Sequence, residues 1–279
     1  MMKKPLEAVI TDLDGSLLSN TKEIGTADHK TIATLKGMGI PVFIATGRHQ
    51  AITRCYAKQV GTELPVITSN GGLLYDFSKE EIVFAKHLSP QDVTELKAFV
   101  LNRGLYYFIY SDKQCFLNNS NPDAEFYKMD LELMSIANED EFEIMSKDFE
   151  PTDYNVIKFM IPNCTPEILE ELQQLSCMRA GRVVPTYSGD MFLDINPAGV
   201  SKGAAAKKLS ELYGFSLANT LAMGDNFNDA AMLQAVGYSV VPETAHEGVQ
   251  ALARFVTCGN NENPITHAVN TLFPGLLGN

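Results

Sequence analysis

The sequence predicts an α/β protein in which a doubly wound parallel sheet is interrupted by an inserted α+β module. Three observations indicate this fold class. The first third of the 279-residue chain alternates short β-rich runs with helical patterns, the last third repeats that rhythm, and the middle does not. Because strands linked by helices through short connections build parallel sheets, we expect the two ends of the chain to form one domain.

The expected elements follow from hydrophobic periodicity and turn residues. In the first third, strands are expected at residues 7–11, 41–45 and 65–68, and helices at 27–38 and from Thr46 to about Val60. In the last third, helices are expected at residues 201–213, 228–236 and 247–255, and strands at 219–223 and 238–241. Polar residues follow several of these strands, at the edge where open parallel sheets bind ligands.

The middle of the chain, from about residue 82 to 184, has a different pattern. Helices are expected at residues 90–102 and 166–178, and strands at 106–110 and 156–161. We therefore divide the chain into a core domain of residues 1–82 and 187–279 and an inserted domain of residues 83–186. The aromatic run at residues 106–110 either lines a substrate pocket or packs as an ordinary strand, which is the more common use of such a run.

The composition restricts the partners of the protein. The formal net charge of −12 argues against nucleic acids and anionic membranes, because both bind a basic face. No stretch approaches the ~18 apolar residues that span a bilayer, so a soluble protein is expected. The five cysteines are scattered and form no CxxC pair, which indicates reduced thiols and a cytoplasmic location.

Two carboxylates follow the first expected strand, in Asp12-Leu13-Asp14-Gly15-Ser16. Such a sequence is most often a plain turn. At the tip of an apolar strand, however, Asp12 would be ionised at neutral pH and could attack phosphorus. Asp14 lies two residues further on and is close enough to Asp12 to act as its proton-transfer partner. Crowding among carboxylates would raise the pKa of Asp14 toward a value suited to that role. The backbone N–H of Leu13 would point at a phosphate oxygen.

Two further segments are expected at helix starts, where free N–H groups bind anions. In Ala45-Thr46-Gly47-Arg48 the alternative is that Thr46 is an ordinary N-cap. In the segment around Ser201, Lys202 falls in the first helical turn, where a cation opposes the helix dipole. The alternative is a surface lysine, but a phosphate facing Lys202 would explain the unfavourable placement.

The fourth segment, Gly224-Asp225-Asn226-Phe227-Asn228-Asp229, places two carboxylates four residues apart between a strand and a helix. The alternative is an Asp-Asn turn with an Asp N-cap. A hard cation would relieve the repulsion between the carboxylates, and a set of oxygen ligands indicates Mg²⁺. The four aspartates would repel one another without a metal, and Mg²⁺, Thr46 and Lys202 would bring the charges of the site into balance with a bound phosphate dianion, as phosphoryl transfer requires.

Taken in order, these motifs resemble the four motifs of the haloacid dehalogenase superfamily. They are Asp12-Leu13-Asp14-Gly15, Ala45-Thr46-Gly47-Arg48, Lys202, and Gly224-Asp225-Asn226-Phe227-Asn228-Asp229-Ala230-Ala231-Met232-Leu233. Asn70-Gly71-Gly72 and Gly199-Val200-Ser201-Lys202-Gly203 further resemble the Cof-like branch, which carries a type IIB cap. The resemblance covers nearly the whole chain.

The resemblance implies a Rossmann-like core, with the inserted domain as a cap that selects the substrate. It implies Asp12 as nucleophile and Asp14 as general acid and then base. The residues that would hold the phosphoryl group are Leu13 through its backbone, Thr46, Gly47, Lys202 and Asn228. The ligands of Mg²⁺ would be Asp12, the backbone carbonyl of Asp14, and Asp225, with Asp229 supporting them from behind. Relatives hydrolyse sugar phosphates and other small phosphate esters.

Two departures from the family pattern are visible. Ser16 stands where the family usually has threonine, and Pro242-Glu243-Thr244-Ala245 replaces the usual Met-Gly-Asn-Ala. In relatives the lost asparagine lies near the active-site rim. We therefore expect an altered substrate preference at Thr244 rather than a loss of catalysis.

The resulting prediction is a Mg²⁺-dependent phosphomonoesterase that acts on a small phosphorylated metabolite through an aspartyl-phosphate. It would be a monomer or a weak homo-oligomer. One alternative is a phosphomutase on the same scaffold, which would return the phosphoryl group to an alcohol. Another is a non-catalytic phosphate or metal sensor, which has no need for a paired nucleophile and acid.

Overall fold

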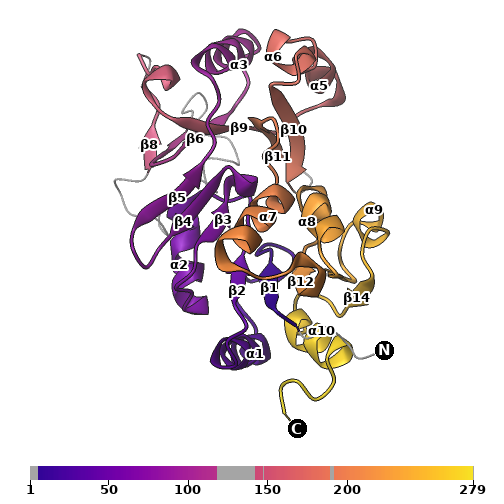
Figure 1. The fold of residues 1–279 in the computed structure, drawn as a ribbon. Helices are drawn as coiled ribbons and strands as arrows, with labels where there is room; N and C mark the ends of the chain where they lie inside the picture. The colour runs from indigo at the N-terminus through magenta and orange to yellow at the C-terminus, as the bar shows by residue number, and fades with distance from the viewer. Residues whose placement is uncertain (1–5, 118–141, 147, 189–191, 279) are drawn as a thin grey trace.

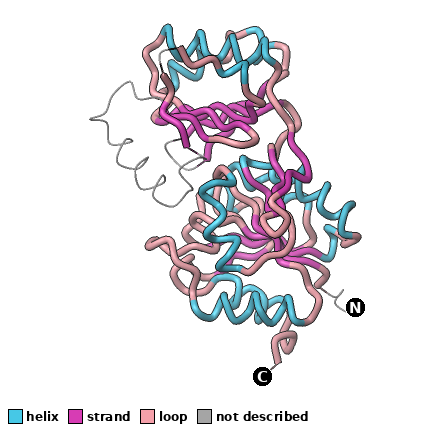
Figure 2. The backbone as a smooth tube through the Cα atoms, turned by 90° about the vertical axis from the view of Figure 1, so that its left-hand side faces the viewer, coloured by secondary structure: helices cyan, strands magenta, loops and turns pink. Residues whose placement is uncertain are grey.

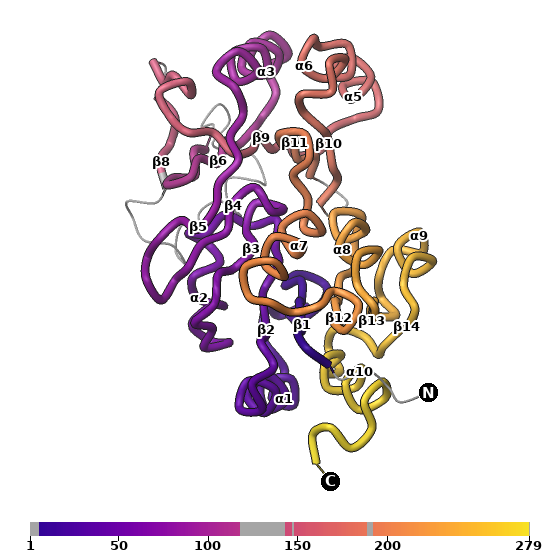
Figure 3. Tube along the Cα trace, in the orientation of Figure 1, coloured from indigo at the N-terminus to yellow at the C-terminus, as the bar shows by residue number. Residues whose placement is uncertain are grey.

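The computed structural model describes residues 6–117, 142–146, 148–188 and 192–278. The chain forms two domains, with both termini at the lower one in the view of Figure 1. The chain passes upward after strand β5 (Glu81–Ala85) and returns after β11 (Phe192–Pro197) to the helix α7 (Lys202–Tyr213) (Figure 3). Within the described ranges, no helix is both long and apolar enough to cross a bilayer.

The lower domain, which we call the core, is built on a parallel sheet with strands from both ends of the chain. Its order is β14-β13-β12-β1-β2, and a parallel bridge from Ala45 to Ile67 places β3 beside β2. These strands are β1 (Ala8–Thr11), β2 (Val42–Ile44), β3 (Val66–Thr68), β12 (Thr220–Met223), β13 (Tyr238–Pro242) and β14 (Phe255–Thr257). The expected doubly wound α/β fold is therefore confirmed.

Helices cover both faces of this sheet, which explains why the central strand β1 is apolar without alternation. Val9 packs on one face with α1 (Thr26–Gly37), α2 (Gln50–Val60) and α10 (Pro264–Leu272). Ala8 and Ile10 pack on the other face with α7 and α8 (Ala230–Ala235). A sheet buried on both faces leaves its strand ends as the accessible place for polar side chains.

Two expected elements of the core are wrong in their bounds. The helix expected at residues 247–255 ends early, because α9 spans Glu247–Gln250 and Phe255 already begins β14. The backbone N–H of Arg254 donates to the carbonyl of Ser239, and this bond brings the chain back to the sheet edge. The helix expected from Thr46 begins only at Gln50, because the ring of His49 accepts from the N–H of Ala51 and caps it.

The chain after β3 also differs from the expectation. It forms a short turn, η1 (Ser69–Gly71), and then an antiparallel hairpin of β4 (Leu73–Asp76) and β5. Asn70 lies in the left-handed region of backbone conformation, with φ of 58°, which asparagine tolerates better than most residues. The hairpin leads directly into the upper domain.

The upper domain, which we call the cap, is a six-stranded sheet of order β10-β11-β9-β6-β7-β8. Its strands are β6 (Phe108–Ser111), β7 (Cys115–Leu117), β8 (Phe142–Ile144), β9 (Val156–Pro162), β10 (Val183–Ser188) and β11. The pairing is antiparallel except between β7 and β8. Because β11 runs to Pro197, the cap sheet continues beyond residue 186, where the sequence placed the end of the inserted domain.

Helices lie on the outer face of the cap sheet, so that the sheet itself faces the core (Figure 2). They are α3 (Pro90–Asn102), α5 (Pro166–Leu172) and α6 (Ser176–Arg179). The single helix expected at residues 166–178 is wrong, because Glu95 of α3 accepts from the N–H groups of Ser176 and Cys177 and starts a second helix there.

Strand β6 reconciles the two uses considered for the aromatic run. Tyr107, which precedes the strand, and Ile109 pack with the helices of the cap. Phe108 and Tyr110 point the other way and pack against Ala51 and Ile52 of α2 in the core. The alternation of a strand thus gives the cap a core of its own and an apolar face toward the core domain.

His49 joins the two domains. Its Nδ1 accepts from the N–H of Ala51, so Nε2 carries the proton and donates to the carbonyl of Ser111 in the cap at 3.0 Å. The ring is fully buried. Burial and the nearby charge of Lys158 lower the pKa of His49 to about 3.

This depressed pKa predicts a loss of stability in mild acid. The unfolded chain takes up a proton near pH 6.5, whereas the folded chain does not, so stability falls as pH drops from 7 toward 3. Between pH 7 and 5 the loss from His49 is about 2 kcal/mol. Urea unfolding at both pH values should show this loss in the wild type and not in His49→Asn, which keeps the helix cap. Equal losses in both proteins would contradict the assignment.

Candidate active site

The four motif segments meet at the carboxyl edge of the core sheet. Asp12 follows β1, Thr46 follows the end of β2, and Asp225 follows β12. These strands are neighbours in the order β12-β1-β2, which is why residues more than 200 positions apart share one site. Lys202 enters from the start of α7, where Ser201 caps the helix through the N–H of Ala204.

A cavity of about 470 Å³ lies between this edge and the cap. Its lining from the core includes Asp12, Asp14, Thr46, Gly47, Arg48, Asp225 and Asn228. Its lining from the cap includes Phe108, Tyr110, Lys158, Met160, Ser188 and Phe192. The core side is polar and charged, and the cap side is mostly apolar.

Lys202 lies between two carboxylates at the centre of the site. Its Nζ donates to Oδ1 of Asp12 at 2.6 Å and to Oδ1 of Asp229 at 2.7 Å. All three side chains are buried. Burial would lower the pKa of Lys202, but the two carboxylates outweigh it and raise that pKa above the usual lysine value. Lys202 is therefore a permanent cation, and the reading as a surface lysine is wrong.

Asp12 has the opposite electrostatic situation. Burial raises its pKa well above the usual aspartate value, against the pull of Lys202 and with a further contribution from Asp229 and Asp225. The backbone N–H of Asp12 donates to the carbonyl of Met223 in β12. This bond fixes the backbone of Asp12 against β12, and its carboxylate lies in a group of acidic side chains with more negative than positive charge.

Asp14 does not have the raised pKa that crowding with carboxylates predicted. Its two oxygens accept from Nε and Nη2 of Arg48, both at 2.6 Å, and Lys22 donates to Oδ1 at 2.7 Å. Burial alone would raise the pKa of Asp14, but these two cations lower it below the usual aspartate range. The prediction failed because it considered only the neighbouring carboxylates, whereas pairing with a cation outweighs carboxylate crowding.

The acidic group fits a divalent cation. Asp12, Asp225 and Asp229 each offer a carboxylate oxygen within 4.8 Å of the others. Burial and the charge of Asp229 raise the pKa of Asp225 to about 7, so the group is electrostatically frustrated in the absence of a cation. A Cβ on Gly15 would lie 2.2 Å from Oδ2 of Asp225, so only glycine lets this carboxylate approach the turn after Asp14.

The remaining residues expected to hold a phosphoryl group are divided between the cavity wall and the interior. Thr46, Gly47 and Asn228 line the cavity, whereas Leu13 is fully buried. The hydroxyl of Thr46 accepts from the N–H of Arg48 at 3.2 Å. Asp229 accepts from the N–H groups of Asp225 and Asn226 through Oδ2, and so holds the loop that carries Asp225.

Several residues of the site were missed by the sequence analysis. Arg48 and Lys22 hold Asp14, while Asn70, Lys158 and Asp194 form a buried polar chain beside Gly47 and Asn228 of the cavity wall. Asn70 was recognised only as part of a family motif. A lysine and an aspartate at the centres of apolar strands were the signal for the other two, because buried charges occur in pairs.

The departure at residues 242–245 lies outside the cavity. Glu243 and Thr244 are exposed just after β13 and are not among its lining residues. Among the described residues, Thr244 has no place in the cavity wall through which it would alter substrate preference.

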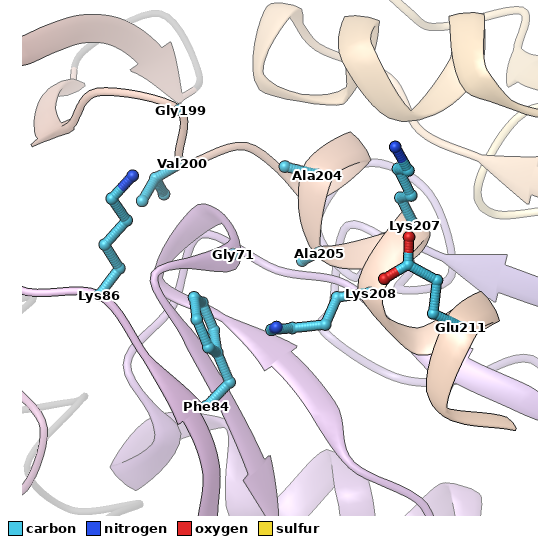
Figure 4. A pocket seen from close by; sticks show the side chains of 10 residues that line it. All are labelled: Gly71, Phe84, Lys86, Gly199, Val200, Ala204, Ala205, Lys207, Lys208 and Glu211. Carbon is cyan, nitrogen blue, oxygen red and sulfur yellow. The ribbon is translucent and has the colours of Figure 1, made fainter.

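A second, smaller cavity of about 280 Å³ lies where the two linkers of the cap meet α7 (Figure 4). Lys86 from the first linker and Gly199 from the second line it, together with Phe84 and Lys208. Lys86 donates to the carbonyl of Ala198, and Lys208 lies over the ring of Phe84 at 4.4 Å. These contacts tie the linkers to each other and to the core, away from the carboxylates of the main cavity.

Comparison with known proteins agrees with this arrangement. Residues 9–269 match the haloacid dehalogenase-like hydrolases. The chain belongs to this family. A 5-amino-6-(5-phospho-D-ribitylamino)uracil phosphatase of Bacillus subtilis is 24% identical, over 97% of this chain and 99% of its own.

Solved structures of the family share the fold. A subclass IIB sugar phosphatase of the haloacid dehalogenase superfamily superposes with a TM-score of 0.82 at 22% identity, covering 97% of this chain and 99% of that one. A phosphatase of the same superfamily from Bacteroides thetaiotaomicron has a TM-score of 0.80 at 21% identity, covering 98% and 96%. The cap sheet inserted between the two halves of the core is thus the subclass IIB arrangement.

The position of Lys202 predicts a large effect on stability. Lys202→Met would leave the buried carboxylates of Asp12 and Asp229 without the cation that pairs with both, which costs about 3–5 kcal/mol in comparable pairs. Urea unfolding in EDTA should show this loss. The matched control is Lys207→Met on the exposed side of the same helix, which should unfold as the wild type does. A Lys202→Met protein as stable as this control would contradict the buried triad.

Proposed function

We propose that this phosphatase of the haloacid dehalogenase family hydrolyses small phosphomonoesters through an aspartyl-phosphate on Asp12. The observation that carries the proposal is the position of Asp12: its carboxylate lines the cavity and is held by Lys202 at 2.6 Å. A nucleophile at the closed end of a pocket, with a fixed cation beside it, is suited to attack a phosphoryl group and to neutralise its charge.

In the first step, a carboxylate oxygen of Asp12 forms a bond to phosphorus while the ester P–O bond breaks. The electron pair leaves with the alcohol oxygen, which takes a proton from Asp14. In the second step, water attacks phosphorus and gives its proton to Asp14, the bond from Asp12 to phosphorus breaks, and phosphate is released. Thr46, Gly47 and Asn228 would donate to the phosphoryl oxygens from the cavity wall.

Asp14 can take the acid role only after its carboxyl group has left Arg48. The paired form carries no proton at neutral pH, since both oxygens accept from the guanidinium. We propose that an entering phosphate ester competes for Arg48, which lines the same cavity, and that this competition frees Asp14 to take up a proton from water and to face the leaving oxygen. Guanidinium groups bind phosphate and carboxylate with the same forked geometry.

Mg²⁺ is the proposed cofactor, with Asp12, Asp225 and the backbone carbonyl of Asp14 as its ligands and Asp229 as their support. The oxygen-only donor set and the raised pKa of Asp225 support a hard divalent cation at this position. When bound, it would neutralise charge on the phosphoryl oxygens. The protein's own contribution is to fix the carboxylates through Lys202 and the loop contacts of Asp229.

The proposed substrates are sugar phosphates and similarly small phosphate esters. The inserted domain, proposed from sequence as residues 83–186 and here including β11, would select among them, because Phe108, Tyr110 and Phe192 line the cavity opposite Asp12. We further propose a cytoplasmic enzyme that acts as a monomer or weak homo-oligomer. Nucleic acids and membranes are not proposed as partners, given the net charge of −12.

Turnover of para-nitrophenyl phosphate tests the reaction. Phosphate release should require Mg²⁺ and stop in EDTA, and Asp12→Asn should abolish it while the protein stays folded. The matched control is Asp28→Asn, a buried carboxylate of the core that binds Thr266 away from the cavity; it should keep wild-type turnover. Activity that survives in Asp12→Asn would exclude the aspartyl-phosphate.

Asp14→Asn should lower kcat by about 10²–10⁴-fold, the usual contribution of general acid–base catalysis. The loss should be smaller for para-nitrophenyl phosphate than for an alkyl phosphate, because nitrophenolate needs little help to leave. An equal loss on both esters would contradict the acid role. Bisphosphate-dependent isomerisation without phosphate release would indicate a mutase, and phosphate binding without turnover on a broad panel would indicate a sensor.

A further inference from the structure

A buried ion pair of the cap lies directly above the phosphate-binding loops. Lys158 of β9 and Asp194 of β11 are on adjacent strands, with Nζ 3.0 Å from Oδ1. Their side chains are 2% and 0% exposed, and Lys158 also lies 4.5 Å from the ring centre of Tyr110. Two buried charges cost free energy unless their remaining hydrogen-bonding groups are also satisfied.

Those remaining groups are satisfied by the core. Lys158 donates to the carbonyl of Gly47 at 2.8 Å, and Oδ2 of Asp194 accepts from Nδ2 of Asn70 at 2.6 Å. The ion pair is therefore complete only while the cap sits on the loops after β2 and β3. Those loops are joined to each other, because the backbone N–H of Asn70 donates to the carbonyl of Thr46.

The contact continues from Asn70 into the cavity wall. Oδ1 of Asn70 accepts from Nδ2 of Asn228 at 3.0 Å. Gly47 lies under this pair, since a Cβ there would meet Oδ1 of Asn70 at 2.8 Å. A chain of contacts thus runs from Asp194 in the cap through Asn70 to Asn228, which lines the cavity.

The direction of these hydrogen bonds is set by Asp194. Oδ2 of Asp194 accepts from Asn70, so Asn70 turns its NH₂ group to Asp194 and its oxygen to Asn228. Asn228 must then donate to this oxygen with one N–H of its own NH₂ group. The second N–H of that group can donate to an anion in the cavity. If the side-chain amide of Asn70 were flipped, its NH₂ group would face Asn228. Asn228 would then have to present its carbonyl oxygen to Asn70, and its NH₂ group would no longer be held in this orientation.

We propose that Asp194 is a positioning residue of the phosphatase reaction: acting through Asn70, it holds the amide of Asn228 as a donor toward the phosphoryl group. Lys158 pairs with Asp194 in the buried site and donates to the carbonyl of Gly47 on the same wall. The cap therefore orients the phosphate site as well as covering it. The proposal rests on the proposed function, because Asn228 is assigned there to the phosphoryl group.

A double-mutant cycle between Asn70 and Asn228 tests the relay. Asn70→Gly removes the amide and suits the left-handed backbone at this position. We expect Asn70→Gly and Asp194→Asn each to lower kcat/KM for para-nitrophenyl phosphate by about 10-fold, with an equal rise in the inhibition constant of inorganic phosphate. When Asn228→Ala is already present, adding Asn70→Gly should lower kcat/KM by less than about 2-fold. Independent, multiplying effects would overturn the proposal.

A control variant separates positioning from stability. Asp92→Asn breaks another ion pair of the cap, between the buried Asp92 and the exposed Arg182 at 2.7 Å on the helix side of the sheet. It should lower the melting temperature while leaving the inhibition constant of phosphate within about 2-fold of wild type. If Asp194→Asn does not fold, the relay is tested by Asn70→Gly and its cycle with Asn228→Ala, because Asn70→Gly leaves the ion pair of Lys158 and Asp194 intact.

The double-mutant cycle can also be measured by phosphate binding, without any ester hydrolysis. Calorimetric binding of inorganic phosphate in the presence of Mg²⁺ should show the same coupling between Asn70 and Asn228. A wild-type protein that binds phosphate but hydrolyses no ester would overturn the proposed function and still decide the relay. A wild-type enzyme that hydrolyses the ester with additive variants would overturn the relay and leave the proposed function standing.

Discussion

The placement of Lys202 between Asp12 and Asp229 is the interaction on which the site depends. Three buried charges are brought together from β1, α7 and the loop after β12, so the sheet order and the charge balance require each other. The triad carries two negative charges and one positive charge, and Asp225 adds a further carboxylate with a raised pKa. This excess of negative charge makes an acidic protein able to hold a cation, and through it an anionic substrate.

The same principle operates at the boundary between the two domains. His49, Lys158 and Asp194 are buried polar groups whose hydrogen bonds are completed by the opposite domain. Apolar contacts between α2 and the face of β6 that carries Phe108 and Tyr110 provide area, but they do not specify one orientation. The polar contacts do, because an unpaired buried donor or charge costs more than a slipped apolar contact.

Much of the architecture was predictable because it rests on local periodicity. The central strands, the cap insertion and the close set of carboxylates at strand ends follow from apolar runs that stop at polar residues. The failures occurred where a distant side chain decided the outcome. Glu95 divides one expected helix into two by capping Ser176, and His49 moves the start of α2. Glu95 lies 81 positions before Ser176, and His49, although it directly precedes α2, donates to the carbonyl of Ser111 in the cap, 62 positions away.

The sequence by itself determined the family, the sheet and the identity of the charged groups at its carboxyl edge, because strand and motif patterns are local. Only the tertiary structure decided which charges meet. Arg48 and Lys22 reach Asp14 and lower its pKa, whereas crowding without them predicted the reverse. Asn70 and Asp194, 124 positions apart, become partners through the docking of the cap. Electrostatic energies depend on distances of a few ångströms and on burial, and folding alone sets these quantities.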